Sequence, residues 1–251
     1  MKSKRLIVVS LDALSSIDFD MFSKLPNFKK FIRHAACCRQ VRSVYPSLTY
    51  PAHTSIVTGR TPAHHGIVNN ILLQPERSSP DWYWQRNYIR GTTLYDEVLK
   101  QGKHVAALLW PVTAKSEITW NLPEIFANRR WTNQILTSAA NGTVGYQLML
   151  NHRFGRLRDG IRQPALDNFV HASLKYTLKT YRPDLTLVHF TDLDTQRHHY
   201  GVHSEEAAAA IKRHDERIGE LMHLLHQNRM SVKRDTTVII LGDHSQLDVR
   251  N

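Results

Sequence analysis

LIVVSLD, residues 6–12, is an apolar run rich in β-branched side chains that ends at a carboxylate. Similar apolar runs recur as HVAALL at 104–109, LTLVHF at 185–190 and TTVIIL at 236–241. Continuous apolar runs of this length are typical of strands that are buried on both faces of a parallel sheet. The four runs therefore predict the strands of one mostly parallel sheet.

Helical patterns separate these runs along the chain. They cover residues 18–32, 51–58, 93–101, 164–181 and 204–227. Alternation of strands and helices is typical of α/β proteins, so we predict a layered α/β/α fold around a mostly parallel central sheet. With 251 residues, 41% of them hydrophobic, the chain can build one large core, and we predict a single domain over 1–251.

Two segments fit the alternation poorly. They are 72–90 (LLQPERSSPDWYWQRNYIR) and 121–162, both rich in Trp, Tyr, Asn and Arg. Ligands of open α/β sheets bind beyond the carboxyl ends of the strands, so we expect these insertions to form a cap over that edge. The alternative is an ordinary surface excursion whose aromatic side chains pack on one another.

The charge of the chain favours an acidic partner without identifying it. The formal charge is +11, from 33 Lys and Arg against 22 Asp and Glu, which suits a phosphorylated small molecule. The basic residues are scattered, without a run of five and without interleaved aromatics, so no nucleic-acid partner is predicted. Simple solvation of the surface is an equally open explanation for the charge.

The cysteines and the N-terminus bear on the cellular compartment. Cys37 and Cys38 are neighbours, which argues against a disulfide framework and indicates a reducing, cytoplasmic setting. The basic start MKSKR is followed by a short apolar run that meets Asp12, so no signal peptide is predicted, and no run approaches the length of a membrane span. Nothing in the sequence specifies an oligomeric state.

Three carboxylates follow predicted strands. Asp12, Asp194 and Asp243 each come just past an apolar run, and a parallel sheet brings such strand ends to one edge. A single Asp in this place is more often a helix cap or a turn residue. Three of them, two with a His close by in the sequence (His198 and His244), favour a metal site instead.

The mixture of ligands indicates the metal and the chemistry. Asp and His together suit Zn²⁺, and a set this large suits two ions better than one, although Mn²⁺ or iron could compete. Paired metals about 4 Å apart are a standard device for in-line displacement at phosphorus. The sequence therefore predicts two zinc ions and a reaction that needs a nucleophile.

Thr49 is the candidate nucleophile. It opens the segment TYPAHTSIVT, in which Pro51 suits the first turn of a helix that would end at Gly59. A hydroxyl at this position feels the positive end of the helix dipole, and the free backbone amides there can bind a phosphoryl oxygen. The alternative is that Thr49 serves only as the N-cap of the helix.

Four segments carry a family resemblance. TYPAHTSIVTGRTPAHHGIVNN (49–70), DTQRHHYG (194–201) and GDH (242–244) resemble the nucleophile and metal-binding segments of the nucleotide pyrophosphatase/phosphodiesterase family of the alkaline phosphatase superfamily. LLWPVTAKSEITWNLPEIF (108–126) is similar to the family segment that lines the substrate pocket. The matches occur in family order and span nearly the whole chain, so the resemblance implies an alkaline-phosphatase-like fold and a hydrolase.

The resemblance implies a role for each matched residue. One zinc is expected on Asp12, Thr49, Asp243 and His244, and the other on Asp194 and His198. Thr49 would form a phospho-threonine intermediate. Asn70 and the backbone N–H of Tyr50 would donate hydrogen bonds to a phosphoryl oxygen, the Tyr50 ring would face a nucleobase, and Trp110 would belong to the substrate pocket. No ligand role falls to His64, His65 or His199.

The chain departs from the family pattern at two points. Ser245 stands where the family has Gly after its Asp-His pair. The family completes the second zinc site with a His far downstream, which no residue before Asn251 matches. We therefore expect a fragment or truncated gene product in which the second site is incomplete.

The expected activity is metal-dependent hydrolysis of phosphodiester or pyrophosphate bonds in nucleotide-like substrates. A phosphomonoesterase or phosphonate hydrolase on the same scaffold is one alternative. A non-catalytic fragment that binds metal or phosphate is another. The sequence does not specify the leaving group of the substrate.

Overall fold

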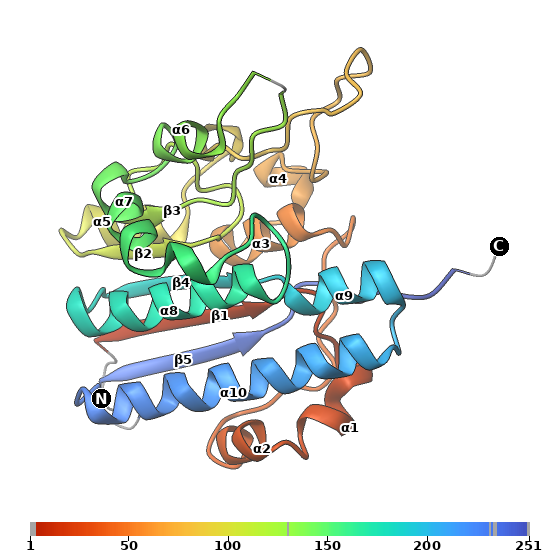
Figure 1. The fold of residues 1–251 in the computed structure, drawn as a ribbon, viewed down its shortest axis with the longest axis vertical. Coiled ribbons are helices and arrows are strands. Elements are labelled where there is room, and N and C mark those ends of the chain that lie inside the picture. The colour runs from red at the N-terminus through yellow and green to blue at the C-terminus, as the bar shows by residue number, and fades with distance from the viewer. Residues whose placement is uncertain (1–3, 130, 231, 233–234, 250–251) are drawn as a thin grey trace.

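The computed structural model describes residues 4–129, 131–230, 232 and 235–249. Within these residues five strands form one parallel sheet in the order β3-β2-β4-β1-β5 (Figure 1). The strands are β1 (Arg5–Leu11), β2 (Val105–Leu108), β3 (Trp120–Leu122), β4 (Leu185–Phe190) and β5 (Thr236–Leu241). The predicted α/β fold with a parallel central sheet is confirmed.

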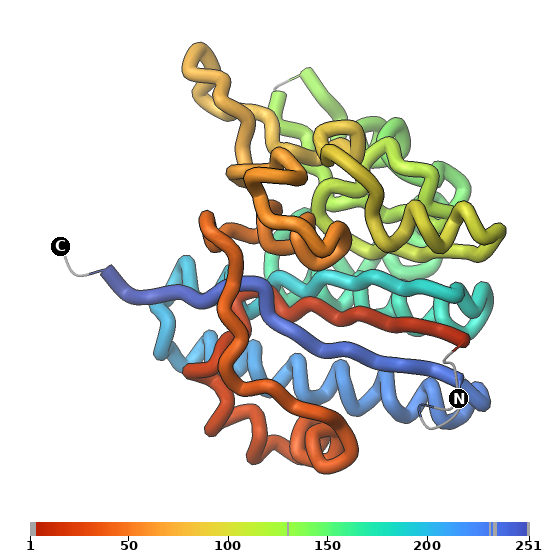
Figure 2. The backbone as a smooth tube through the Cα atoms, turned by 180° about the vertical axis from the view of Figure 1, so that it is seen from behind, coloured from red at the N-terminus to blue at the C-terminus, as the bar shows by residue number. Residues whose placement is uncertain are grey.

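Helices cover both faces of the sheet because alternate strand residues point to opposite sides. Ile7, Val9 and Leu11 of β1 pack in one core with α8 (Ala165–Thr180) and α10 (Glu205–Gln227). Val8, between them, packs in a second core with α3 (Thr49–Thr58) and α5 (Leu94–Lys100). Figures 1 and 2 show the two faces of this layered arrangement.

The remaining helices are short and lie in the connections. They are η1 (Ser16–Asp18), α1 (Phe19–Phe22), α2 (Pro26–Ile32), α4 (Pro62–His65), η2 (Arg86–Tyr88), α6 (Gln134–Ala139), α7 (Val144–Phe154), η3 (Gly155–Leu157) and α9 (Asp192–Tyr200). The single helix predicted over 18–32 is divided, because Pro26 opens a new helix at its first turn. Helix α9 was not predicted, and it carries two of the predicted site residues.

Strand β5 differs from the expectation that it is buried on both faces. It lies at one edge of the sheet formed by the described residues, next to β1. Ile239 in its middle is 41% exposed. An apolar run therefore predicted the strand correctly but not its edge position, which depends on the strand order.

The two segments expected to be insertions differ from each other. In the first, Trp84 and Ile89 pack in a small aromatic core with Tyr50. The second, expected over 121–162, begins within strand β3 (Trp120–Leu122), and α7 packs against this strand. Leu150 of α7 is fully buried in the main core. A strand of three residues is too short to stand out as an apolar run.

The described residues contain no helix that combines the length and the apolar character needed to cross a bilayer. The first residues of the basic start MKSKR, positions 1–3, lie outside the described residues.

Candidate active site

The three predicted carboxylates lie at the carboxyl edge of the sheet. Asp12 follows β1 directly, and its backbone N–H donates to the Phe190 carbonyl at the end of β4. Asp243 follows β5, and Asp194 lies in the first turn of α9, which extends beyond the strand ends (Figure 1). Figure 2 shows the segment between α2 and α3 crossing the end of β5. There the Ser43 hydroxyl donates to the Asp243 carbonyl at 2.6 Å.

Three predicted ligands converge on an imidazole nitrogen of the fourth, His244. His244 Nε2 lies 3.1 Å from Thr49 Oγ1, 3.2 Å from Asp12 Oδ1 and 3.5 Å from Asp243 Oδ2. We call Asp12, Thr49, Asp243 and His244 the deep cluster. Asp12 directly follows β1, Thr49 opens α3, and Asp243 and His244 follow β5, so only the parallel sheet brings them together.

Thr49 is positioned by the start of α3. It is the first helical residue, whereas the N-cap is Leu48, so the alternative that Thr49 is the N-cap is wrong. The helix ends as predicted at Gly59, whose φ of +64° is in the left-handed region that glycine favours. The Thr49 hydroxyl therefore takes no part in capping and points to His244.

Asn70 lies against the same helix start. Its Oδ1 accepts a hydrogen bond from the Tyr50 backbone N–H at 2.9 Å. The amide that was expected to bind a phosphoryl oxygen is thus engaged by Asn70 in this structure. The bond also fixes the orientation of the Asn70 side chain, because Oδ1 faces the helix and Nδ2 faces away from that amide.

The deep cluster has the donor chemistry of a cation site. Asp12 Oδ1 and Asp243 Oδ2 are buried and have no hydrogen-bond partner among the described residues. Burial, with the Asp243 carboxylate next in importance, raises the pKa of Asp12 well above its usual value. Buried carboxylate oxygens without partners are costly, and a divalent cation satisfies them. The residues present therefore fit a divalent cation.

Asp194 and His198 form a second, more exposed group, which we call the rim pair. They are one helical turn apart on α9, with 3.4 Å between Asp194 Oδ1 and His198 Nε2, and the His198 side chain is 68% exposed. Asp194 Oδ1 also accepts a hydrogen bond from Gln246 Nε2 at 2.5 Å. Burial raises the pKa of Asp194.

The structure groups Asp194 differently from the predicted ligand sets. Single ligand atoms of Asp12, Asp194 and His244 lie within 4.8 Å of one another. Asp194 therefore borders the deep cluster on one side and His198 on the other. Asp194 is placed where it could belong to either of the two predicted ion positions.

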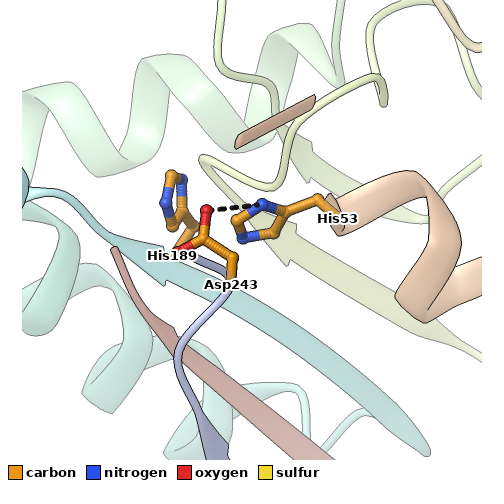
Figure 3. Close-up of side chains that lie close together, drawn as sticks. All are labelled: His53, His189 and Asp243. Atoms are coloured by element: carbon orange, nitrogen blue, oxygen red, sulfur yellow. Dashed lines mark ion pairs between the residues drawn. The ribbon is translucent and has the colours of Figure 1, made fainter. Parts of the chain in front are cut away.

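Two buried histidines escaped the sequence analysis. Ligand atoms of His53, His189 and Asp243 also lie within 4.8 Å of one another. Figure 3 shows these three side chains close together, with a dashed line for the contact between His53 Nδ1 and Asp243 Oδ2. His53 Nδ1 lies 2.8 Å from the Thr49 carbonyl, which can only accept, and His53 Nε2 lies 2.9 Å from the Ser10 hydroxyl. Both ring nitrogens have hydrogen-bond partners, and burial lowers the pKa of His53 to about 3. His53 is therefore neutral, and its Nδ1–H supports the start of α3 by donating to the Thr49 carbonyl.

His189 links two carboxylates. Its Nε2 lies 3.1 Å from Asp12 Oδ2, and its Nδ1 lies 3.2 Å from Glu124 Oε2 and 3.2 Å from the Leu109 carbonyl. Burial alone would lower the pKa of His189, but the hydrogen bonds to Asp12 and Glu124 raise it well above its usual value. A histidine inside the apolar run LTLVHF was the signal in the sequence that could have identified it.

The two aromatic residues expected to meet the substrate lie in the core. Tyr50 and Trp110 are both 0% exposed. The Tyr50 hydroxyl donates to Glu124 Oε1 at 3.3 Å, and the Trp110 ring packs edge-on against His53. Neither ring presents a surface to a nucleobase in this structure, because Trp82 packs on Tyr50 and Trp110 lies in the core beneath α3 and α5.

The three histidines without an expected ligand role stay apart from both groups. His64 and His199 are exposed, and His65 Nε2 is hydrogen-bonded to the Ser55 hydroxyl at 2.9 Å. None of them appears in the two candidate metal-binding groups found among the described residues.

Comparisons with known proteins identify the family to which the chain belongs. Residues 6–251 match the family model of type I phosphodiesterase / nucleotide pyrophosphatase. The chain is 26% identical over 231 residues to ectonucleotide pyrophosphatase/phosphodiesterase family member 1 of Homo sapiens, a match that covers 88% of this chain and 21% of that protein. It is 25% identical over 251 residues to venom phosphodiesterase of Macrovipera lebetinus, covering 95% and 25%. The chain thus spans about a quarter of the length of these curated relatives.

Solved structures share the fold. The murine ectonucleotide pyrophosphatase / phosphodiesterase 5, an inactive threonine-to-alanine variant in complex with AMP, superposes with a TM-score of 0.65 at 19% identity, covering 97% of this chain and 57% of that one. The human protein of the same name gives a TM-score of 0.66 at 20% identity, covering 98% and 58%. Because the family model matches nearly the entire sequence, this chain belongs to the type I phosphodiesterase / nucleotide pyrophosphatase family.

Proposed function

We propose that the deep cluster is the catalytic centre of a zinc-dependent phosphodiester hydrolase in which Thr49 is the nucleophile. The observation that carries the proposal is the convergence of Thr49 Oγ1, Asp12 Oδ1 and Asp243 Oδ2 around His244 Nε2. Two of these atoms are buried carboxylate oxygens without a hydrogen-bond partner among the described residues. This combination suits a cation that also binds the hydroxyl of the nucleophile.

Asp12, Thr49, Asp243 and His244 would hold the first zinc, and Asp194 and His198 would contribute to the second. When bound, such ions lower the pKa of a coordinated hydroxyl and offset negative charge on phosphoryl oxygens. The distances support this assignment for the deep cluster, and the contact between Asp194 and His198 supports it for the rim pair.

Thr49, Asn70 and His53 have different roles in the proposed reaction. The Thr49 oxygen loses its proton and attacks phosphorus, the bond from phosphorus to the leaving oxygen breaks, and a phospho-threonine forms while the leaving oxygen takes up a proton from solvent. A water molecule then attacks phosphorus, the bond from phosphorus to the Thr49 oxygen breaks, and one proton of that water restores the hydroxyl. Asn70 Nδ2 donates to a non-bridging oxygen of the phosphoryl group. His53 supports the helix start by donating from Nδ1 to the Thr49 carbonyl at 2.8 Å.

The substrate class in this proposal is a nucleotide-like phosphodiester or pyrophosphate. It is supported by the names of the relatives and by the AMP bound in the murine structure. The inactive murine variant, in which a threonine is replaced by alanine, supports a threonine nucleophile. A reducing compartment is also part of the proposal, and the free, exposed Cys37 and Cys38 are its support.

Rates on bis-p-nitrophenyl phosphate and p-nitrophenyl phosphate, with metal content measured, test the proposal. We expect the diester to be hydrolysed faster. Thr49→Ala should lose covalent labelling and nearly all turnover while it keeps most of its zinc, because Asp and His ligands remain. Thr49→Ser, which retains a hydroxyl, is the matched control and should keep part of the activity.

Other outcomes favour the alternatives. Near-normal turnover by Thr49→Ala would show that Thr49 is not the nucleophile. A preference for the monoester would favour a phosphomonoesterase. Metal binding without turnover of either compound would favour a binding role.

A further inference from the structure

A buried arginine joins α9 to the turn that follows β1. Arg197 is 4% exposed and lies between Asp194 and His198 along the helix. Its Nη1 donates to the Ala13 carbonyl at 2.5 Å, and its Nη2 donates to Asp18 Oδ1 at 2.5 Å. The guanidinium therefore contacts two points of one turn at the same time.

That turn also carries the deep cluster. Ala13 directly follows Asp12 and has a φ of +61°, in the left-handed region. Its N–H donates to Asp243 Oδ1 at 3.1 Å, while its carbonyl accepts from Arg197. One residue thus connects Asp243 with the helix of the rim pair.

The turn is held firmly on its other sides. Asp18 Oδ2 accepts from the Ser15 backbone N–H at 2.9 Å, so the same carboxylate closes the turn and pairs with Arg197. A Cβ at Gly242, just before Asp243, would lie 1.7 Å from the Leu14 carbonyl oxygen. The backbone just after β5 therefore packs tightly against Leu14 of this turn, so the turn has little room to move.

We propose that Arg197 is a positioning residue that sets the spacing between the deep cluster and the rim pair by fastening α9 to the turn after Asp12. The inference rests on the proposed function, because the spacing matters only if both groups bind metal. A guanidinium suits this task because its donors have a fixed planar geometry, whereas a lysine ammonium reaches one partner as a point charge. Asp18 neutralises the cation, so the guanidinium can lie close to a metal site.

Cobalt binding tests the proposal independently of turnover. Co²⁺ is titrated into the wild type and into Arg197→Met, Arg197→Lys and Asp18→Asn, and its affinity and visible absorption are recorded. We expect Arg197→Met to weaken Co²⁺ binding by about 10- to 100-fold, the range for residues that support metal ligands. Arg197→Lys should recover part of this loss, and kcat should fall more than KM changes.

Asp215→Asn is the matched control. Asp215 is a buried carboxylate that accepts backbone N–H groups of Asn27 and Phe28 at the start of α2, so its loss also removes buried hydrogen bonds. This variant should melt at a lower temperature but keep the Co²⁺ affinity and spectrum of the wild type. A purely structural role for Arg197 would make both variants behave alike.

The outcomes separate this inference from the proposed function. Unchanged Co²⁺ affinity, spectrum and kcat in a folded Arg197→Met protein would overturn the positioning role and leave the proposed function intact. If Arg197→Met does not fold, the test uses Arg197→Lys and Asp18→Asn instead. Co²⁺ binding as tight as that of the wild type in both of these variants would overturn the positioning role. A wild type that binds no Co²⁺ would refute the proposed function itself, and the inference with it.

Discussion

The deep cluster and the rim pair use the same carboxylate and imidazole groups in opposite surroundings. In the deep cluster the side chains of Asp12 and Asp243 are 5% and 0% exposed, and its members lie after β1, at the start of α3 and after β5. In the rim pair, both members lie on one turn of α9, and the His198 side chain is 68% exposed. Ligands that come together from the ends of separate strands are buried by the surrounding elements, as in the deep cluster. The two ligands of the rim pair lie on one helix and stay in contact with water.

The difference has an energetic consequence. Buried charges interact strongly because little solvent screens them, while exposed pairs are screened and contribute little. Substitutions in the deep cluster should therefore reduce metal affinity and turnover strongly, and substitutions in the rim pair should reduce them less. Each of the following measurements tests that ranking.

The largest effect is expected from Asp12→Asn. The substitution keeps the size of the side chain but removes the negative charge of a buried carboxylate whose Oδ1 has no hydrogen-bond partner among the described residues, so metal affinity should fall strongly. Phosphodiester turnover should drop by about three orders of magnitude, the upper end for losing one preorganised electrostatic group. Steady-state rates and zinc content measure it.

Asp194→Asn is the matched substitution in the rim pair and should cost less than Asp12→Asn under the same conditions. Equal losses of turnover and zinc content in Asp12→Asn and Asp194→Asn would contradict the ranking of the two regions.

A smaller effect is expected from His198→Ala. Because the imidazole is largely exposed and contacts only Asp194 among the ligand groups, its removal should lower turnover by roughly 10- to 100-fold, the range for groups that support a metal site. His199→Ala provides the control, since His199 is the exposed neighbour and should leave the rate unchanged. A loss as large as that of Asp12→Asn would place His198 among the principal ligands.

Zinc should raise the thermal stability of the protein mainly through the deep cluster. A ligand at about 100 times its Kd stabilises the folded state by about 2.7 kcal/mol, which corresponds to a rise in Tm of roughly 5–10 °C for a chain of this size. Differential scanning fluorimetry with zinc and with a chelator measures the rise. Asp12→Asn should abolish most of it, and His198→Ala should keep most of it. The reverse pattern would contradict the ranking.

The smallest effect concerns Gln246, which donates a hydrogen bond to Asp194 Oδ1. Removing this donor in Gln246→Ala frees the carboxylate oxygen, so metal binding at the rim pair should tighten by about fivefold, the value of one net hydrogen bond. Isothermal titration calorimetry resolves a change of this size. Weaker binding in Gln246→Ala would instead show that Gln246 supports Asp194.

Several parts of the fold were predictable because their signals are local. Apolar runs identified four of the strands, and Pro51 with Gly59 identified the course of α3. Strand β3 was missed because three residues form no readable run, and α9 was missed because its sequence DLDTQRHHY is too polar for an amphipathic pattern. Burial of Tyr50 and Trp110 was missed because it depends on aromatics that pack from other segments.

The sequence by itself determined which residues stand at the strand ends, because a carboxylate directly after an apolar run is visible in one dimension. Only the tertiary structure decided how each carboxylate is used. Asp12 Oδ2 faces His189, 177 positions away, while Oδ1 is left without a hydrogen-bond partner among the described residues. The physical reason is that hydrogen bonding and burial depend on neighbours in space, and residues so distant in the chain meet only when β1 and β4 pair in register.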